Sequence, residues 1–309
     1  MRTFGFSRYA VGFCAAAAIL CGCGGSQLPI GVSQNGAQSL PSMKRGTPGG
    51  DLLYVSDYST FDVYALSYPS GNLVLTLKGF GAPQGLCSDK SGDVFVTDAK
   101  AATIIEYAHG GTTPIKTLNG LGRPSACWVD PTTGNLAVAN LNSFVSIYKN
   151  ASGSPSNYST QTSAIFCAYD ESGNLYVDEP GQLSTGNQVE VLPKGGNSFE
   201  TMNLNKGLGN SWPGGVQWHG QHLIVAKEGS YYGRIYRFIV KGTNGYHAGS
   251  FRTDTGIADF LIYGSTLIAT TLDGEIEYYD WTHWQGPIKK FSSPGRYPFG
   301  VTISPASSR

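Results

Sequence analysis

A short apolar run that ends in a polar residue recurs six times along the chain. The runs are LYVSD (53–57), VFVTD (94–98), LAVAN (136–140), LYVDE (175–179), LIVAK (223–227) and LIATT (267–271). They align without gaps, and their starts lie 39 to 48 residues apart. Runs of this kind are typical of largely buried strands. The chain therefore repeats one unit, and each copy contains a buried strand.

Three further strands accompany each buried run. An alternating, half-buried strand follows it, at 61–66, 103–108, 144–149, 188–193, 234–240 and 275–280. A more polar strand suited to an outer edge comes next, at 73–78, 114–119, 156–161, 198–203, 247–252 and 287–292. A fourth type stands before the buried run, at 83–89, 124–130, 163–170, 213–220, 256–264 and 298–304.

Four strands in a unit of about 40–45 residues predict an all-β fold, a six-bladed β-propeller with four antiparallel strands per blade. A sandwich would not repeat one strand order, and an open solenoid would need capping repeats. Residues 51–78 lack a strand of the fourth type, whereas 298–304 form such a strand with nothing after it. We expect this C-terminal strand to join the N-terminal blade and close the ring.

Two copies of the unit carry a more specific pattern, PQGLCSDKSGDVFVTD (83–98) and PSACWVDPTTGNLAVAN (124–140). They resemble the repeats of NHL-repeat propellers and of the related gluconolactonase-like and YVTN-type propellers. The resemblance covers residues 51–304 and fades in the last two units, where the polar ends become Lys227 and Thr271. It implies that the strand of the fourth type is innermost, at a central channel. It does not fix the function, because one fold serves many functions.

The polar ends of the buried strands should lie around one mouth of the channel. The candidates for a divalent cation there are Asp57, Asp98, Asn140 and Glu179, because their oxygens suit such an ion. The alternative is that each side chain binds the backbone of its own turn, as Asp and Asn do at strand ends. A channel cation is the one cofactor that the pattern suggests.

A second set of candidates lies on the same face and does not repeat from blade to blade. Aromatic walls with a few polar groups are the usual lining of a ligand pocket. The predicted ligand-binding residues are Tyr58, Trp212, Lys227, Glu228, Tyr231 and Tyr232. The alternative is that the aromatic residues fill the channel or pack between blades. Asp259 is also unusual, because it interrupts an otherwise apolar innermost strand.

The three cysteines of the repeat region are Cys87, Cys127 and Cys167. Cys127 and Cys167 hold the same position in adjacent innermost strands, and Cys87 is offset from it by one residue. Equivalent positions on neighbouring blades should be too far apart for a disulfide. We expect three small buried side chains; a Cys87–Cys127 bridge across one blade interface is the conceivable alternative.

The N-terminal residues predict export and lipidation. Arg2 and Arg8 precede the apolar run AVGFCAAAAIL (10–20), which is too short to span a bilayer and fits a signal peptide over 1–22. Gly22 before Cys23 resembles a bacterial lipobox, which implies that Cys23 carries the lipid. Residues 23–50 are rich in Gly, Ser, Gln and Pro and predict a flexible tether. The propeller would then occupy 51–309.

Composition and charge narrow the function. The chain has 21 acidic and 21 basic residues, which gives no electrostatic surface for nucleic acid. We expect a monomeric lipoprotein of the bacterial cell envelope, on the periplasmic or extracellular side, whose propeller is a non-enzymatic binding or scaffold module. Its partner would be a protein, a glycan or a small ligand. The alternatives, from the resemblance, are a metal-dependent hydrolase or lactonase and a streptogramin-lyase-like enzyme.

The lipobox makes a direct prediction. A Cys23→Ser variant should lose membrane association, because no thiol remains to receive the lipid, while the propeller unfolds at an unchanged temperature. Membrane fractionation and thermal unfolding measure the two outcomes. A variant that still sediments with the membrane contradicts the lipidation of Cys23.

Overall fold

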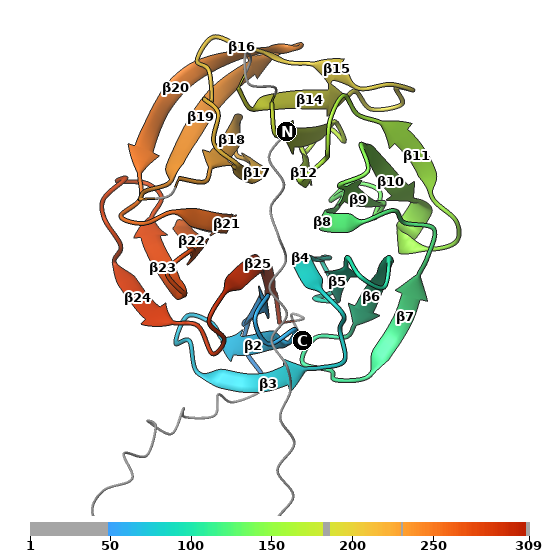
Figure 1. Cartoon of the computed structure of the whole chain (residues 1–309), viewed down its shortest axis with the longest axis vertical. Coiled ribbons are helices and arrows are strands. Elements are labelled where there is room, and N and C mark those ends of the chain that lie inside the picture. The colour runs from blue at the N-terminus through green and yellow to red at the C-terminus, as the bar shows by residue number, and fades with distance from the viewer. Residues whose placement is uncertain (1–48, 182–185, 230, 307–309) are drawn as a thin grey trace, which may run out of the picture. The chain divides into compact units, whose positions relative to one another are not determined.

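The repeat region forms a ring of six antiparallel sheets, the blades of a β-propeller (Figure 1). The computed structural model describes residues 49–181, 186–229 and 231–306. The predicted signal peptide and Cys23 lie outside these residues. No helix in the described ranges is long and apolar enough to cross a membrane. The fold is all-β, as the sequence pattern predicts.

The first three blades follow the predicted strand order from the channel outward. Blade 1 contains β25 (Pro298–Ser304), β1 (Leu52–Asp57), β2 (Val63–Ser67) and β3 (Leu73–Leu77). Blade 2 contains β4 (Pro83–Ser88), β5 (Val94–Asp98), β6 (Thr103–Tyr107) and β7 (Pro114–Leu118). Blade 3 contains β8 (Pro124–Val129), β9 (Leu136–Asn140), β10 (Phe144–Tyr148) and β11 (Ser156–Ser159), with a 3₁₀ turn at Lys149–Ala151.

The other three blades keep this order with one exchange at the rim. Blade 4 contains β12 (Phe166–Tyr169), β13 (Leu175–Glu179), β14 (Gln188–Leu192) and β15 (Glu200–Thr201). Blade 5 contains β17 (Pro213–His219), β18 (His222–Lys227), β19 (Arg234–Lys241), β20 (Asn244–Arg252) and the added β16 (Asn203–Leu204). Blade 6 contains β21 (Ile257–Tyr263), β22 (Thr266–Thr271), β23 (Glu275–Asp280) and β24 (Lys289–Ser292).

The extra strand in blade 5 corrects the prediction of one outer strand over 198–203. Only Glu200 and Thr201 pair with β14, and the chain then leaves blade 4. Asn203 and Leu204 pair in parallel with Asn244 and Gly245 of β20 instead. Met202, between the two short strands, is buried in the core shared by these blades. The outer strand thus links two blades.

The predicted closure of the ring by the C-terminal strand is confirmed. β25 pairs antiparallel with β1, so that Val301 lies opposite Val55 and Ile303 opposite Leu53. Figure 1 shows the red C-terminal strand beside the blue first blade. The side chains of Val301 and Ile303 are buried in one cluster with Leu53 and Val55. The two chain ends therefore form one blade with a common core.

Polar side chains connect the innermost strands of neighbouring blades. The hydroxyl of Thr97 in blade 2 donates to Gly85 O at 2.9 Å and to Ser125 O of blade 3 at 3.3 Å. Gln217 in blade 5 exchanges two hydrogen bonds with the backbone of Ile262 in blade 6, at 2.7 and 3.1 Å. Buried backbone groups at the channel are thereby satisfied.

The cysteines differ from the main expectation. Cys87 of β4 and Cys127 of β8 form a disulfide with a Cα–Cα distance of 5.6 Å. The expectation that all three cysteines are simple buried fillers is therefore wrong for these two. The one-residue offset lets their side chains meet where the innermost strands converge, although 40 residues separate them in sequence. Cys167 is free and buried.

The closing strand should determine the stability of the whole ring. Ile303 is 3% exposed and Ile288, on the rim, is 65% exposed. We expect Ile303→Ala to lower the free energy of unfolding by about 2–5 kcal/mol, because it leaves a cavity in the core between blades 1 and 6. The matched control Ile288→Ala should change it by less than about 0.5 kcal/mol.

Chemical denaturation measures both variants, and deleting residues 296–309 is the stronger form of the test. We expect the deletion to unfold the ring at a much lower temperature. An unchanged melting curve after the deletion contradicts the role assigned to β25.

Candidate functional site

One face of the propeller carries a pocket of about 280 Å³. Its walls come from loops and strand ends of blades 5, 6 and 1. They consist of Tyr58, Trp212, Glu228, Ala258, Thr271, Leu272, Tyr297, Pro298 and Phe299. This is the face on which the second strand of each blade, counted from the channel, ends; these strands are β1, β5, β9, β13, β18 and β22. We call this hollow the aromatic pocket.

Backbone pairing places the four main side chains of the aromatic pocket in two pairs. In blade 5, Glu228 N donates to Trp212 O at 2.8 Å. In blade 1, Tyr58 N donates to Tyr297 O at 2.9 Å. Each pair therefore joins the loop before an innermost strand to the end of the strand beside it. The three aromatic side chains are half-exposed, at 50% for Tyr58, 51% for Trp212 and 55% for Tyr297.

The structure brings together three of the six predicted ligand-binding residues. Tyr58, Trp212 and Glu228 line the aromatic pocket, whereas Lys227, Tyr231 and Tyr232 are not among its lining residues. Tyr231 is highly exposed, and Tyr232 lies under the guanidinium of Arg252, 3.6 Å from the ring centroid.

Sequence reasoning missed Leu272, Tyr297 and Phe299. For Tyr297 the available signal was an aromatic residue directly before the proline that opens an innermost strand. This pattern occurs at Trp212-Pro213 and again at Tyr297-Pro298.

Glu228 is the charged group of the aromatic pocket. It is the one charged residue among the nine that line this hollow. Within the described ranges its carboxylate has no hydrogen bond and no ion pair, although its backbone N–H is bonded to Trp212. Burial raises the pKa of Glu228, because no neighbouring group compensates for the lost hydration of the carboxylate.

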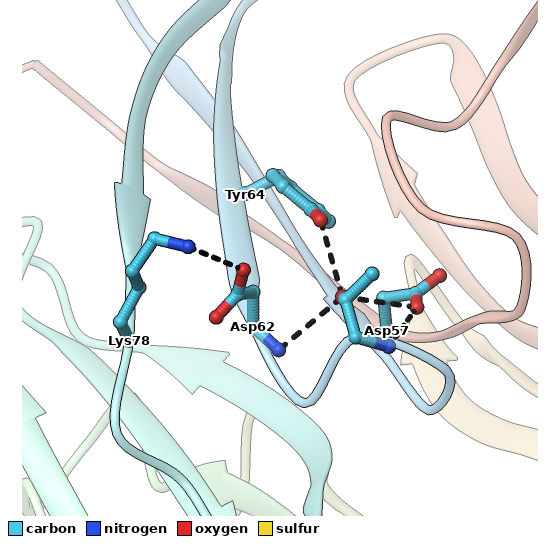
Figure 2. Close-up of polar contacts among 5 residues, drawn as sticks. Asp57, Asp62, Tyr64 and Lys78 are labelled. Carbon is cyan, nitrogen blue, oxygen red and sulfur yellow. Dashed lines mark hydrogen bonds and ion pairs between the residues drawn. The ribbon is translucent and has the colours of Figure 1, made fainter. Parts of the chain in front are cut away.

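The predicted cation ligands serve the backbone instead. Asp57 Oδ1 accepts hydrogen bonds from Ser59 N and Thr60 N, both at 2.9 Å, and Oδ2 accepts one from Tyr297 N at 2.8 Å. Figure 2 shows Asp57, Asp62 and Tyr64 of the adjoining network. The Thr60 hydroxyl donates to Asp57 Oδ1 and accepts from Asp62 N and from the hydroxyl of Tyr64. Burial alone would raise the pKa of Asp57, but these hydrogen bonds outweigh it and lower the pKa.

The same arrangement recurs in the next three blades. Asp98 accepts from Gly81 N and Ala82 N at 2.7 and 2.9 Å, Asn140 from Gly122 N at 3.1 Å, and Glu179 from Thr162 N at 3.1 Å. Each side chain thus fastens the loop that leads to the innermost strand of its own blade. No group of three or more His, Cys, Asp or Glu side chains in the described part of the chain could hold a metal ion. The structure does not bring the four predicted ligands together.

Two buried carboxyl groups lie deeper, beside the innermost strand of blade 5. Asp178 Oδ1 accepts from Phe166 N at 3.0 Å, and its Oδ2 has no hydrogen-bond partner among the described residues. Asp259 accepts from Phe260 N at 2.8 Å and from Val301 N of blade 1 at 3.2 Å. Burial raises the pKa of both groups well above the ordinary value, and for Asp178 the charge of Asp259 adds to this.

A second hollow of about 420 Å³ lies at the opposite mouth of the channel. Trp128, Leu261 and Tyr263 are among its partly exposed walls, beside the disulfide sulfur of Cys87. The polar groups here are largely committed to the fold: Tyr263 donates to Asp51 at 2.9 Å, and Asp130 accepts from its own turn. Sequence reasoning gave no indication of this hollow.

The comparisons with known proteins identify the architecture. No family model and no curated protein matches the chain. A chain in the crystal structure of a nidogen/laminin complex superimposes with a TM-score of 0.64 at 16% identity, over 84% of this chain and 100% of that one. Hydrazine synthase from Kuenenia stuttgartiensis superimposes with a TM-score of 0.59 at 12% identity, over 81% of this chain and 80% of that one. At these identities the likeness shows the fold alone, and the protein is a six-bladed β-propeller.

The buried Asp178 predicts a particular dependence of stability on pH. Its pKa in the folded state is raised, so the unfolded chain releases this proton first as pH rises above about 4. The stability that the protonated group contributes is complete below that pH and is lost as pH rises toward the folded-state pKa. Over this pH window the free energy of unfolding of Asp178→Asn should rise relative to that of the wild type by up to about 1.4 kcal/mol per pH unit.

Chemical denaturation at a series of pH values measures this difference, with the exposed Glu200→Gln as the matched control. The control should follow the wild type at every pH. Parallel curves for Asp178→Asn and the wild type would show that Asp178 ionises normally in the fold.

Proposed function

We propose that this protein is a lipid-anchored envelope protein whose propeller is a non-enzymatic binding module, and that the aromatic pocket is its binding site. The observation that carries the proposal is the grouping of three half-exposed aromatic side chains around a hollow with one carboxylate that has no partner among the described residues. A group of exposed apolar side chains around one concave surface is typical of a binding site, because leaving apolar surface in water does not stabilise the fold.

The N-terminal end of the described chain lies on the side of the propeller opposite the aromatic pocket. Asp51, just before β1, bonds to Ala306 N at 2.9 Å and to the hydroxyl of Tyr263 at 2.9 Å. Tyr263 lines the mouth opposite the aromatic pocket. The described chain therefore enters the propeller on the side opposite the aromatic pocket. The lipid on Cys23 would hold the protein at a bacterial membrane, on the periplasmic or extracellular side.

The relationship to NHL-repeat and gluconolactonase-like propellers belongs to this proposal as well. The motif at 83–98 supports it, and the hydrogen bonds of Asp98 give that motif a structural reason. A hydrolase or lactonase would need acidic ligands that converge in the channel. No observation among the described residues favours that activity, so the binding module is the function proposed.

A thermal-shift screen of glycans and small molecules tests the location of the binding site. At a concentration of about 100 times Kd, a ligand should raise the melting temperature by roughly 5–10 °C, because it binds only the folded state. Trp212→Ala and Tyr58→Ala should remove most of this shift. The matched control is Tyr246→Ala, which removes an exposed ring on the rim strand β20.

Two results bear on the proposal in opposite ways. A shift that persists in the control and disappears in the two pocket variants supports the aromatic pocket. A ligand whose shift is unaffected by both pocket variants binds elsewhere and contradicts the proposed site.

A further inference from the structure

The isolation of Glu228 distinguishes it from buried and partly buried glutamates elsewhere in the propeller, such as Glu106, Glu179 and Glu275. Glu106 has Lys116 at 2.7 Å, and Glu275 has Lys290 at 3.1 Å. Glu179 accepts from Gln188 at 2.8 Å. Glu228 has no such partner within the described residues, although it is half-buried between Trp212 and the end of β18. A positive charge entering the aromatic pocket would supply the missing counter-charge.

The aromatic walls favour the same kind of ligand. Tyr58, Trp212 and Tyr297 surround the hollow, and each ring face carries negative electrostatic potential. A cation within about 6 Å of such a ring gains about 0.5–2 kcal/mol, with Trp the strongest partner. Rings from two blades and a carboxylate therefore act on one small volume, and all of them attract positive charge.

The supply of hydrogen-bond acceptors decides which cation fits. A primary ammonium presents three N–H donors that need acceptors, and a metal ion such as Ca²⁺ needs about six to eight oxygens. The lining side chains that offer acceptors are the carboxylate of Glu228 and the hydroxyls of Tyr58 and Tyr297, far fewer oxygens than a metal ion needs. The hydroxyl of Thr271 is already bonded to Asp273 and to the backbone of Glu275. A quaternary ammonium has no N–H donor and requires only negative charge and apolar contact.

We propose that the aromatic pocket binds a quaternary ammonium group, with Glu228 as its counter-charge and Tyr58, Trp212 and Tyr297 as its walls. This inference rests on the proposed binding function and names the chemical class of the ligand. The class covers small molecules and larger ligands that present a trimethylammonium head.

Titration calorimetry of the full-length protein with choline tests the inference. The comparison probe is 3,3-dimethylbutan-1-ol, which has the same shape with carbon in place of the charged nitrogen. We expect choline to bind with a Kd of about 1 mM or tighter, and the neutral probe to bind at least about tenfold more weakly. Ethanolamine, a primary amine, should also bind more weakly than choline, because its compact ammonium is more strongly hydrated and makes less apolar contact with the rings.

Variants of the pocket separate the contribution of the Glu228 charge to binding from that of the aromatic walls. Glu228→Gln should weaken choline binding at least about tenfold and leave the neutral probe unaffected. Trp212→Ala should weaken both probes, and the exposed rim variant Glu200→Gln, the matched control, should change neither. Thermal unfolding confirms that each variant is folded, and Tyr58→Ala replaces Trp212→Ala if that variant is not.

Each outcome decides between the inference and the proposed function. If choline and the neutral probe bind equally well and both lose affinity in Trp212→Ala, the pocket is a binding site but the assignment of a cation is overturned. Choline binding that is insensitive to Glu228→Gln also overturns the assignment. If choline shows no saturable binding up to about 50 mM, the inference of a quaternary ammonium ligand is overturned. The proposed binding function is then tested by the ligand screen alone.

Discussion

The antiparallel pairing of β25 with β1 is the contact on which the rest of the molecule depends. It joins residues that lie more than 240 positions apart, such as Val55 and Val301, and completes the blade that closes the ring. The same pairing sets the loop before Pro298 against the end of β1, where Tyr58 N bonds to Tyr297 O and Asp57 bonds to Tyr297 N. Three of the four aromatic residues that line the pocket, Tyr58, Tyr297 and Phe299, therefore meet through ring closure. Stability and the candidate site share one structural cause.

The aromatic pocket lies where the repeat is least regular. In blades 1 to 4 the last residue of the second strand is Asp57, Asp98, Asn140 or Glu179, and each is used to hold a loop. Blades 5 and 6 have Lys227 and Thr271 at this position, followed by Glu228 and Leu272. The backbone bond that Tyr58 N makes to Tyr297 O in blade 1 recurs there, from Glu228 N to Trp212 O and from Leu272 N to Gly256 O, without a side-chain bond beside it within the described residues. The side chains of Glu228 and Leu272 are thus free to line a hollow.

The periodic part of this structure could be predicted from sequence, because a strand with one buried face leaves a pattern in its own residues. The six buried runs, the closing strand and the grouping of Tyr58, Trp212 and Glu228 on one face follow from such patterns. Tyr297 was missed although closure was predicted, because its place before Pro298 was a signal only in comparison with Trp212-Pro213, and no repeated pattern marks Phe299 as part of a pocket. The Cys87–Cys127 bridge depends on how closely the innermost strands approach one another. The position of β16 depends on which of two neighbouring blades a short edge strand pairs with. Such distances between units are not encoded in the period of one unit.

The central claim is that ring closure assembles an aromatic pocket in which Glu228 lacks a counter-charge. A crystal structure of the protein grown with choline tests this most directly. The account predicts density for the ammonium group against the carboxylate of Glu228, within about 6 Å of the rings of Trp212 and Tyr297. An empty aromatic pocket in which the carboxylate of Glu228 is paired with a side chain of the protein would contradict it.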